Sequence, residues 1–190
     1  MNYSNELKCN PDIFEIFKPI RINEDLIITW LYHDELEIES KMLFNVSKSL
    51  EVKNFLPGIF VNSETEAKKK FVDLLGRQIH KQALIFCIRI TKTKMPIGYV
   101  MLNSPTSEYN LNEWVLDFWL MPQYRGGNIM THALYNILNY SKGKGINLVL
   151  AQVNTENKSA LVLLTKLGFG DVSEQFNKLK SDQKMLCVPL

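Results

Sequence analysis

One short turn in this sequence has the residue types needed to bind a phosphate group. The apolar run Glu113–Leu120 ends at Pro122, Arg125-Gly126-Gly127 follows, and helical periodicity begins at Met130. A helix N-terminus offers unpaired backbone N–H groups and a positive dipole end, and glycine lets the backbone approach a ligand closely. By itself, such a turn is more often a plain strand-to-helix connection. If it binds pyrophosphate, Arg125 would hold an oxygen, and the backbone N–H groups would come from Gly126, Gly127, Asn128, Ile129, Met130 and Thr131.

Two carboxylates in the preceding run are candidates for acid–base chemistry. Glu113 and Asp117 flank Val115, so all three side chains lie on one face of an extended strand. A carboxylate in an apolar strand is costly to bury unless it has a partner or a function. We expect Asp117 to be a general base and Glu113 to be the second candidate. The alternative is a structural carboxylate with a satisfied hydrogen-bond partner.

Several other functional classes are disfavoured by the composition. The chain carries 22 Lys and Arg against 20 Asp and Glu, which is too balanced for a typical nucleic-acid-binding domain. Neither the G-x-x-x-x-G-K-[ST] nor the G-x-G-x-x-G phosphate motif is present. The three cysteines form no CxxC motif or His/Cys cluster, so we expect no metal site.

Two segments resemble signatures of the GNAT superfamily of N-acetyltransferases. Met121–Leu134, with the order Pro-Gln-Tyr-Arg-Gly-Gly-Asn near its start, is similar to the family's acyl-CoA loop. Asn154-Thr-Glu-Asn157, followed by Lys166-Leu-Gly-Phe169, is similar to its later N-x-x-N and K-L-G-F signature. The Ile-Met-Thr sequence after the loop and Trp30 resemble the branch that acetylates ribosomal-protein N-termini.

The resemblance implies direct acetyl transfer from acetyl-CoA to a primary amine, without a metal. It implies a strand splayed from its neighbour, with backbone groups of Leu120 and Met121 available to the pantetheine arm and the thioester oxygen. Asn157 would bind pantetheine or cap a helix. The sequence departs from the family pattern in Asn128, which replaces a glycine, and in Leu164, which replaces the tyrosine that protonates the CoA thiolate. A non-catalytic acyl-CoA-binding module and a transferase of longer acyl chains therefore remain alternatives.

The alternation of patterns predicts one mixed α/β domain over residues 1–190. We expect a central, mostly antiparallel sheet of six or seven strands, flanked by about four helices. The poorly patterned stretch Glu37–Asn62 reads as a long functional loop. Strands are expected at Ile13–Ile22, Ala83–Ile90, Ile97–Asn103, Glu113–Leu120, Ile146–Val153, Phe169–Glu174 and Met185–Val188. Helices are expected after the potential caps Asn23, Ser63 and Asn157 and from about Met130.

The expected partners follow from this assignment. The acceptor would be a small-molecule amine or a peptide N-terminus, held by Glu37–Asn62, Ser104–Asn112 and the loop near Asn177–Gln183. We expect no nucleic-acid partner and no membrane segment, because no apolar run is long enough to cross a bilayer. The expected location is the cytoplasm, and the expected assembly is a monomer or a homodimer.

Overall fold

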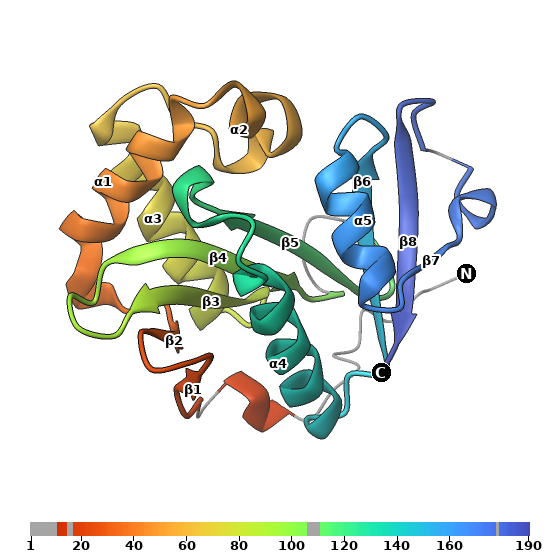
Figure 1. Cartoon of the computed structure of the whole chain (residues 1–190), viewed down its shortest axis with the longest axis horizontal. Coiled ribbons are helices and arrows are strands. Elements are labelled where there is room, and N and C mark those ends of the chain that lie inside the picture. The colour runs from red at the N-terminus through yellow and green to blue at the C-terminus, as the bar shows by residue number, and fades with distance from the viewer. Residues whose placement is uncertain (1–10, 15–16, 106–110, 178) are drawn as a thin grey trace.

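A single eight-stranded sheet organises the computed structural model, which describes residues 11–14, 17–105, 111–177 and 179–190 (Figure 1). The strand order is β1-β2-β3-β4-β5-β6-β8-β7, and every pairing is antiparallel except that of β5 with β6. The strands are β1 (Ile20–Arg21), β2 (Leu26–Trp30), β3 (Ala83–Ile90), β4 (Pro96–Asn103), β5 (Trp114–Leu120), β6 (Leu148–Asn154), β7 (Gly170–Asp171) and β8 (Gln183–Pro189). The mixed α/β class is confirmed, and the strand count is slightly higher than expected.

Five α-helices cover the two faces of this sheet. They are α1 (Leu36–Ser47), α2 (Leu50–Phe55), α3 (Glu64–Ile79), α4 (Ile129–Gly143) and α5 (Lys158–Lys166). One hydrophobic cluster packs α4 and α5 against one face, and a second packs α1, α2 and α3 against the other. No helix in the described part of the chain is long and apolar enough to cross a membrane.

Local capping signals account for the helices that were predicted well. The Ser63 hydroxyl accepts a hydrogen bond from Glu66 N–H at 3.1 Å, as expected at the start of α3. Asn157 Oδ1 accepts from Ala160 N–H at 3.2 Å at the start of α5. β3, β4 and β5 also begin and end within a residue of their predicted bounds.

The expectations for the N-terminal region were largely wrong. Among the described residues of the predicted strand Ile13–Ile22, Ile13 and Phe14 belong to a 3-10 helix at Pro11–Phe14, and Ile20–Arg21 form the two-residue strand β1. The predicted helix after Asn23 is instead strand β2, which pairs with β3 along its whole length. Asn23 Oδ1 accepts from the N–H groups of Asp25 and Leu26, both at 2.9 Å, so it caps a turn between strands rather than a helix.

The predicted long loop Glu37–Asn62 is also wrong, because α1, α2 and a 3-10 turn at Pro57–Ile59 fill it. Its helical period is blurred by polar residues that face the core: Glu39, Ser40 and Ser47 are all buried. Ser47, for example, accepts from Val61 N–H at 3.1 Å and donates to Leu43 O at 3.0 Å. The bond to Leu43 is local, the bond from Val61 is tertiary, and a hydrophobicity pattern reveals neither.

The sheet opens between β5 and β6. Their parallel pairing comprises only Trp114↔Val149 and Val115↔Leu150. Beyond this point β5 stays paired with β4 as far as Leu120↔Gly98, and β6 stays paired with β8 as far as Asn154↔Gln183. The two strands therefore diverge, and the gap between them lies beside the start of α4 and beside α5.

Candidate functional site

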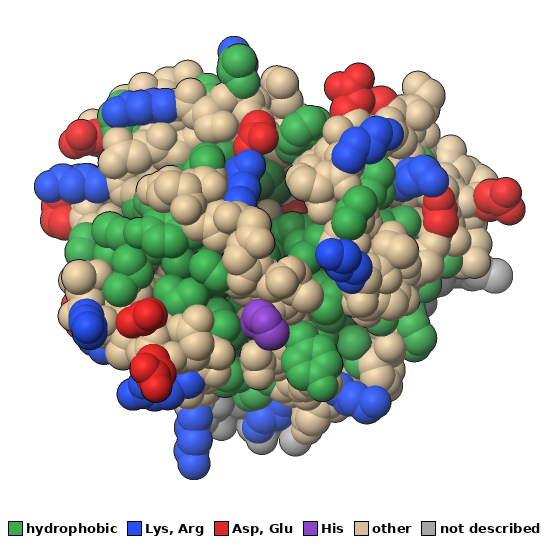
Figure 2. All heavy atoms as spheres, viewed as in Figure 1, with side chains coloured by type: hydrophobic (Ala, Val, Ile, Leu, Met, Phe, Trp, Pro, Cys, Tyr) green, Lys and Arg blue, Asp and Glu red, His purple; other side chains and the backbone are tan. Residues whose placement is uncertain are grey.

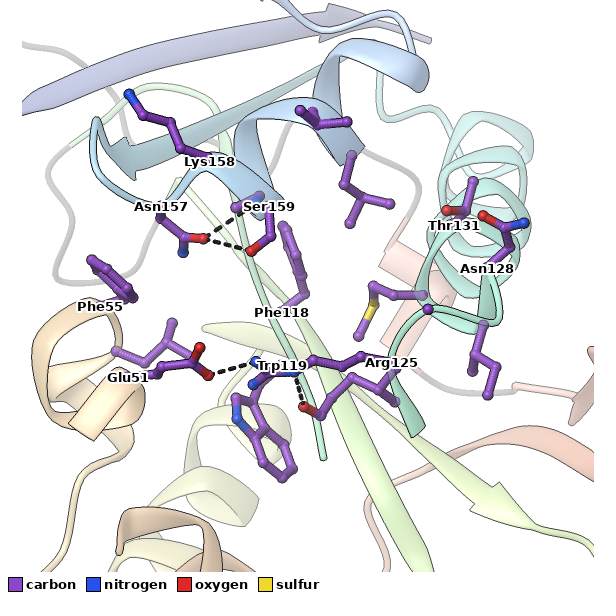
Figure 3. A pocket seen from close by; sticks show the side chains of 18 of the residues that line it. Glu51, Phe55, Phe118, Trp119, Arg125, Asn128, Thr131, Asn157, Lys158 and Ser159 are labelled. Carbon is purple, nitrogen blue, oxygen red and sulfur yellow. Dashed lines mark hydrogen bonds and ion pairs between the residues drawn. The ribbon is translucent and has the colours of Figure 1, made fainter. Parts of the chain in front are cut away.

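A cavity of about 570 Å³ lies at this gap, bounded by a floor and three walls (Figure 3). Residues of α2 form one wall, β5 forms the floor, and the turn before α4 forms the side opposite α2. The third wall is formed by α5 and its N-cap residue, Asn157. Figure 2 shows the surface hollowed between the α2 region and the α5 region, with charged side chains beside the hollow.

Most of the residues predicted to bind the cofactor line this cavity. They are Leu120, Arg125, Gly126, Asn128, Ile129, Met130, Thr131 and Asn157. Gly127 is exposed and lies outside the lining. Met121 also lies outside it and packs on the opposite face, against the cluster around α1 and α3.

The N-terminus of α4 presents open backbone donors to the cavity. Asn128 is its N-cap residue, with φ 57° and ψ 13°, and its side chain makes no capping hydrogen bond. Asn adopts this left-handed conformation more readily than most residues, which explains how it replaces a glycine here. In the described structure, the first bond of the helix runs from His132 N–H to Asn128 O at 3.0 Å. The N–H groups from Ile129 to Thr131 therefore lack a partner within the helix.

Arg125 links two walls of the cavity through its side chain. Its Nε donates to Leu120 O at 3.1 Å, and its Nη1 forms an ion pair with Glu51 Oε2 on α2 (Figure 3). Both side chains of the pair are partly open to solvent, at 39% for Arg125 and 54% for Glu51. The guanidinium thus contacts a carboxylate of the protein in this structure.

Successive peptide groups of β5 point alternately toward β4 and toward the gap between β5 and β6. Met121 N–H donates to Ile97 O at 2.8 Å, so the residues in phase with Met121 turn their peptide groups toward β4. The peptide groups of Phe118 and Leu120 consequently face the gap, in agreement with the bond from Arg125 to Leu120 O. The Met121 N–H was expected to be available to a thioester and is instead paired within the sheet.

The α5 wall carries both polar and apolar groups. Asn157 Oδ1 accepts from Ser159 Oγ at 3.0 Å as well as from Ala160 N–H, so its oxygen serves as a helix cap. Lys158 and Lys166 add two positive charges to the lining. Leu164, at the family's tyrosine position, is fully buried in the core and contributes no proton donor.

Neither predicted catalytic carboxylate belongs to the cavity lining. Asp117 lies on the face of β5 that points toward α3, and its Oδ2 accepts from Asn103 Nδ2 at 2.8 Å. Asn103 Oδ1 in turn accepts from Arg77 Nη2 of α3 at 2.7 Å. Glu113 lies in the bend before β5, at the end far from the gap. Asp117 is therefore held by a chain of polar contacts, beside the segment of β5 that has separated from β6.

The sequence motifs did not identify the α2 wall, which comprises Glu51, Val52, Phe55 and Leu56. These residues belong to the stretch expected to hold the acceptor, but α2 has only six residues and no recognisable motif. Phe118 and Trp119 of β5 were also missed as lining residues. Their only signal was their position directly before Leu120.

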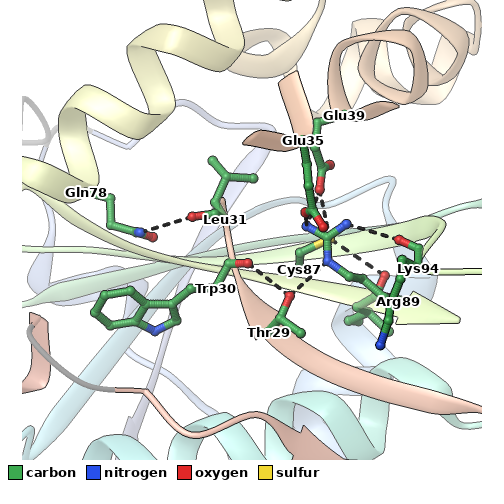
Figure 4. A network of polar contacts seen from close by, with 10 residues as sticks. Thr29, Trp30, Leu31, Glu35, Glu39, Gln78, Cys87, Arg89 and Lys94 are labelled. Atoms are coloured by element: carbon green, nitrogen blue, oxygen red, sulfur yellow. Dashed lines mark hydrogen bonds and ion pairs between the residues drawn. The ribbon is translucent and has the colours of Figure 1, made fainter. Parts of the chain in front are cut away.

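A second charged cluster lies outside the cavity, where α1 packs on β2 and β3 (Figure 4). Arg89 Nη2 contacts both Glu39 Oε1 and Glu35 Oε2, Nε donates to Thr29 Oγ1 at 2.9 Å, and Nη1 donates to Lys94 O at 3.2 Å. Burial raises the pKa of Glu39 to about 7, against the opposing effect of Arg89. The residues described include no group of three or more His, Cys, Asp or Glu side chains suited to a metal ion.

Comparisons with known proteins agree with this geometry. The chain superimposes on the ribosomal-protein-S5-alanine acetyltransferase of Vibrio fischeri with a TM-score of 0.70 and 15% identity, over 91% of this chain and 97% of that one. It superimposes on RimL, a ribosomal L7/L12 α-N-protein acetyltransferase solved with coenzyme A, with a TM-score of 0.71 and 15% identity, over 91% and 98%. Both neighbours come from the branch that the sequence resembled.

A third structure has a different described role. The microcin C7 self-immunity acetyltransferase MccE, solved with acetyl-CoA and AMP, gives a TM-score of 0.66 and 20% identity, over 94% of this chain and 100% of that one. A comparison with curated protein sequences found no significant match. The model of the acetyltransferase (GNAT) domain matches residues 35–170, which is more than half of the chain. The chain therefore belongs to the GNAT family of acetyltransferases.

Proposed function

We propose that this protein transfers an acetyl group from acetyl-CoA to a primary amine. One observation carries the proposal: the gap between β5 and β6 opens into the same cavity as the N-terminus of α4. An extended pantetheine arm fits a strand edge with open peptide groups, and a pyrophosphate fits a helix N-terminus with open N–H groups. Arg125, Lys158 and Lys166 supply positive charge for the phosphates of the cofactor.

The β5 backbone supports a role in polarising the thioester. The N–H groups of Phe118 and Leu120 point toward the gap, and Met121 N–H is already paired with Ile97 O. A fixed N–H donor stabilises negative charge that develops on a carbonyl oxygen in the transition state. The amine nitrogen attacks the carbonyl carbon, the carbon–sulfur bond breaks, and the CoA thiolate leaves.

Binding of acetyl-CoA is the first test. Acetyl-CoA at about one hundred times its dissociation constant should raise the free energy of unfolding by roughly 2.7 kcal/mol, because it binds only the folded chain. Calorimetry and thermal unfolding measure the binding, and release of the CoA thiol with a panel of amines measures the turnover. The proposal is wrong if millimolar acetyl-CoA gives neither heat nor a thermal shift. Binding without thiol release from any amine would support the non-catalytic module instead.

We further propose that Asp117 removes the proton from the acceptor ammonium, through an intervening water. Asp117 lies on the separated part of β5, and the amide of Asn103 orients its carboxylate. A positioned base contributes about 10²–10⁴-fold in rate. Asp117→Asn should lower kcat by that factor and leave the affinity for acetyl-CoA within a few-fold, and the loss should shrink at high pH, where free amine is abundant. Full activity of a folded Asp117→Asn variant would make the carboxylate structural, and Glu113 would be tested next.

A further inference from the structure

The α2 wall differs in chemistry from the other walls of the cavity. Phe55 and Leu56 are partly exposed and present apolar side chains, Val52 beneath them is fully buried, and Trp119 of β5 lines the same cavity. The side of the cavity opposite α2 is the N-terminus of α4, where the phosphates of acetyl-CoA are expected (Figure 3). Phe55 and Leu56 therefore line the end of the cavity away from that helix N-terminus, and Arg125 reaches across to Glu51 of the same wall.

The charges of the lining argue against a polycationic acceptor. Among the described residues of the lining, the basic side chains Arg125, Lys158 and Lys166 are those assigned above to the phosphates of the cofactor, and Glu51 is the one acidic side chain. A polyamine or an aminoglycoside carries several positive charges and needs several carboxylates to replace its hydration. Of the residues that the structure describes, one carboxylate lines this cavity, and one of its oxygens contacts Arg125.

Glu51 keeps one oxygen available for a single ammonium group. Its Oε2 contacts Arg125 Nη1, whereas its Oε1 has no hydrogen-bond partner among the residues that the structure describes. More than half of the side chain is exposed. An ammonium group donates up to three hydrogen bonds, and a carboxylate oxygen is a strong acceptor for it.

We infer that the acceptor is a monoamine on an apolar body, with its ammonium on Glu51 and its body against Phe55 and Leu56. This inference rests on the proposed acetyl transfer. Two sources share this chemistry: a small aromatic amine, and a peptide N-terminus with an apolar first side chain. Glu51 is thus a residue that determines specificity, on a helix that carries no family motif.

The acceptor class is tested with acetyl-CoA and five amines, by release of the CoA thiol. The probes are phenylethylamine, a tetrapeptide beginning with Phe, the same peptide beginning with Asp, spermidine and kanamycin. We expect kcat/KM for phenylethylamine or the Phe peptide to exceed that of the other three by about tenfold or more, as one charged hydrogen bond and an apolar contact would give. Preference between these two favoured probes identifies the source. Preference for spermidine, kanamycin or the Asp peptide overturns the inference and leaves acetyl transfer intact, whereas no turnover of any amine overturns both.

Two variants test the role of the α2 wall. Glu51→Gln should raise KM for the favoured amine about tenfold, because it removes the charge that receives the ammonium. The same change releases Arg125 for the cofactor, so the dissociation constant of acetyl-CoA should stay the same or fall. Phe55→Ala should also raise KM for the amine, with acetyl-CoA binding unchanged.

Matched controls separate recognition from structure. Glu24→Gln removes the same charge from the exposed turn between β1 and β2, and Leu50→Ala trims an α2 side chain that is 75% exposed and outside the lining. Both controls should keep the parent KM. If Glu51→Gln weakens amine and acetyl-CoA binding equally, the ion pair between Glu51 and Arg125 only stabilises the turn before α4, and the inference is wrong. An unchanged KM in Glu51→Gln would overturn it as well.

Discussion

Arg89 and Arg125 each contact a carboxylate, but the two ion pairs lie in opposite environments. The side chain of Arg89 is 1% exposed and contacts Glu39, which is fully buried. Arg125 and Glu51 are both partly exposed and line a cavity. Removing one partner of a buried pair leaves an uncompensated charge in a low dielectric, whereas water replaces a partner at the surface. The same chemical pair is therefore structural under α1 and open to exchange with a ligand beside α2.

Arg89→Met should have the largest effect of any change to these pairs. It leaves Glu39 and Glu35 without their shared cation, and the free energy of unfolding should fall by about 3–5 kcal/mol. Arg125→Met should change the same quantity by less than about 1 kcal/mol. Urea denaturation at pH 8, above the pKa of about 7 that Glu39 has in the folded chain, measures both variants. Equal losses would contradict the distinction between the two pairs.

The second largest effect is expected in the pH dependence of stability, which should distinguish the buried pair of Arg89 and Glu39 from the exposed pair of Arg125 and Glu51. Burial raises the pKa of Glu39 from an ordinary value of 4.5 to about 7, so the folded chain holds a proton between these values that the unfolded chain has lost. Stability contributed by this group is complete below pH 4.5 and falls as pH rises to 7, by up to about 1.4 kcal/mol per unit and roughly 3 kcal/mol in total.

Glu39→Gln is the variant that isolates this titration. The amide keeps the size of the side chain and an oxygen for Arg89, but does not titrate. Urea denaturation from pH 4.5 to pH 8 should show the parent losing stability relative to the variant as pH rises. Parallel curves would mean that Glu39 has the same pKa in the folded and unfolded chains.

The smallest effect is expected from Glu51→Gln on stability. This change should shift the free energy of unfolding by less than about 1 kcal/mol, and high salt should reduce the shift further, because salt screens exposed charges. Thermal unfolding with and without added salt measures it. A larger loss that is insensitive to salt would place this pair in the same class as Arg89 and Glu39.

The parts of the fold that were predictable depend on contacts close in sequence. Ser63 caps α3 through a residue three positions away, and Asn157 caps α5 at the same spacing. Asn128 lies in a turn that its neighbours Gly126 and Gly127 indicate. Most of the predicted loop residues line the cavity. Local capping predicted these helices, and the turn chemistry together with the family resemblance pointed to residues that line the cavity.

The parts that were not predictable depend on distant partners. Leu26, Ile27, Trp30 and Leu31 recur at helical spacing, but pairing with β3, about sixty positions later, makes this segment a strand. Glu39 interrupts the apolar pattern of α1, so this helix was predicted as a loop. Its partner Arg89 lies fifty positions away and is not visible in the local pattern. Glu51 of α2 meets Arg125 across 74 positions, so no local pattern marks it as part of the cavity.

The opening between β5 and β6 also affects how this sheet avoids aggregation. An exposed strand edge is a template for pairing with another chain, and proteins commonly protect their sheets with short edge strands. Here the outer strands β1 and β7 each have two residues. Within the described residues, a longer stretch of strand edge lies inside the sheet, from Leu116 to Leu120, where β5 is paired with β4 but not with β6. This edge forms the floor of a cavity between α2 and α5. These two helices leave too little room for a strand of another chain, with its side chains, to pair there.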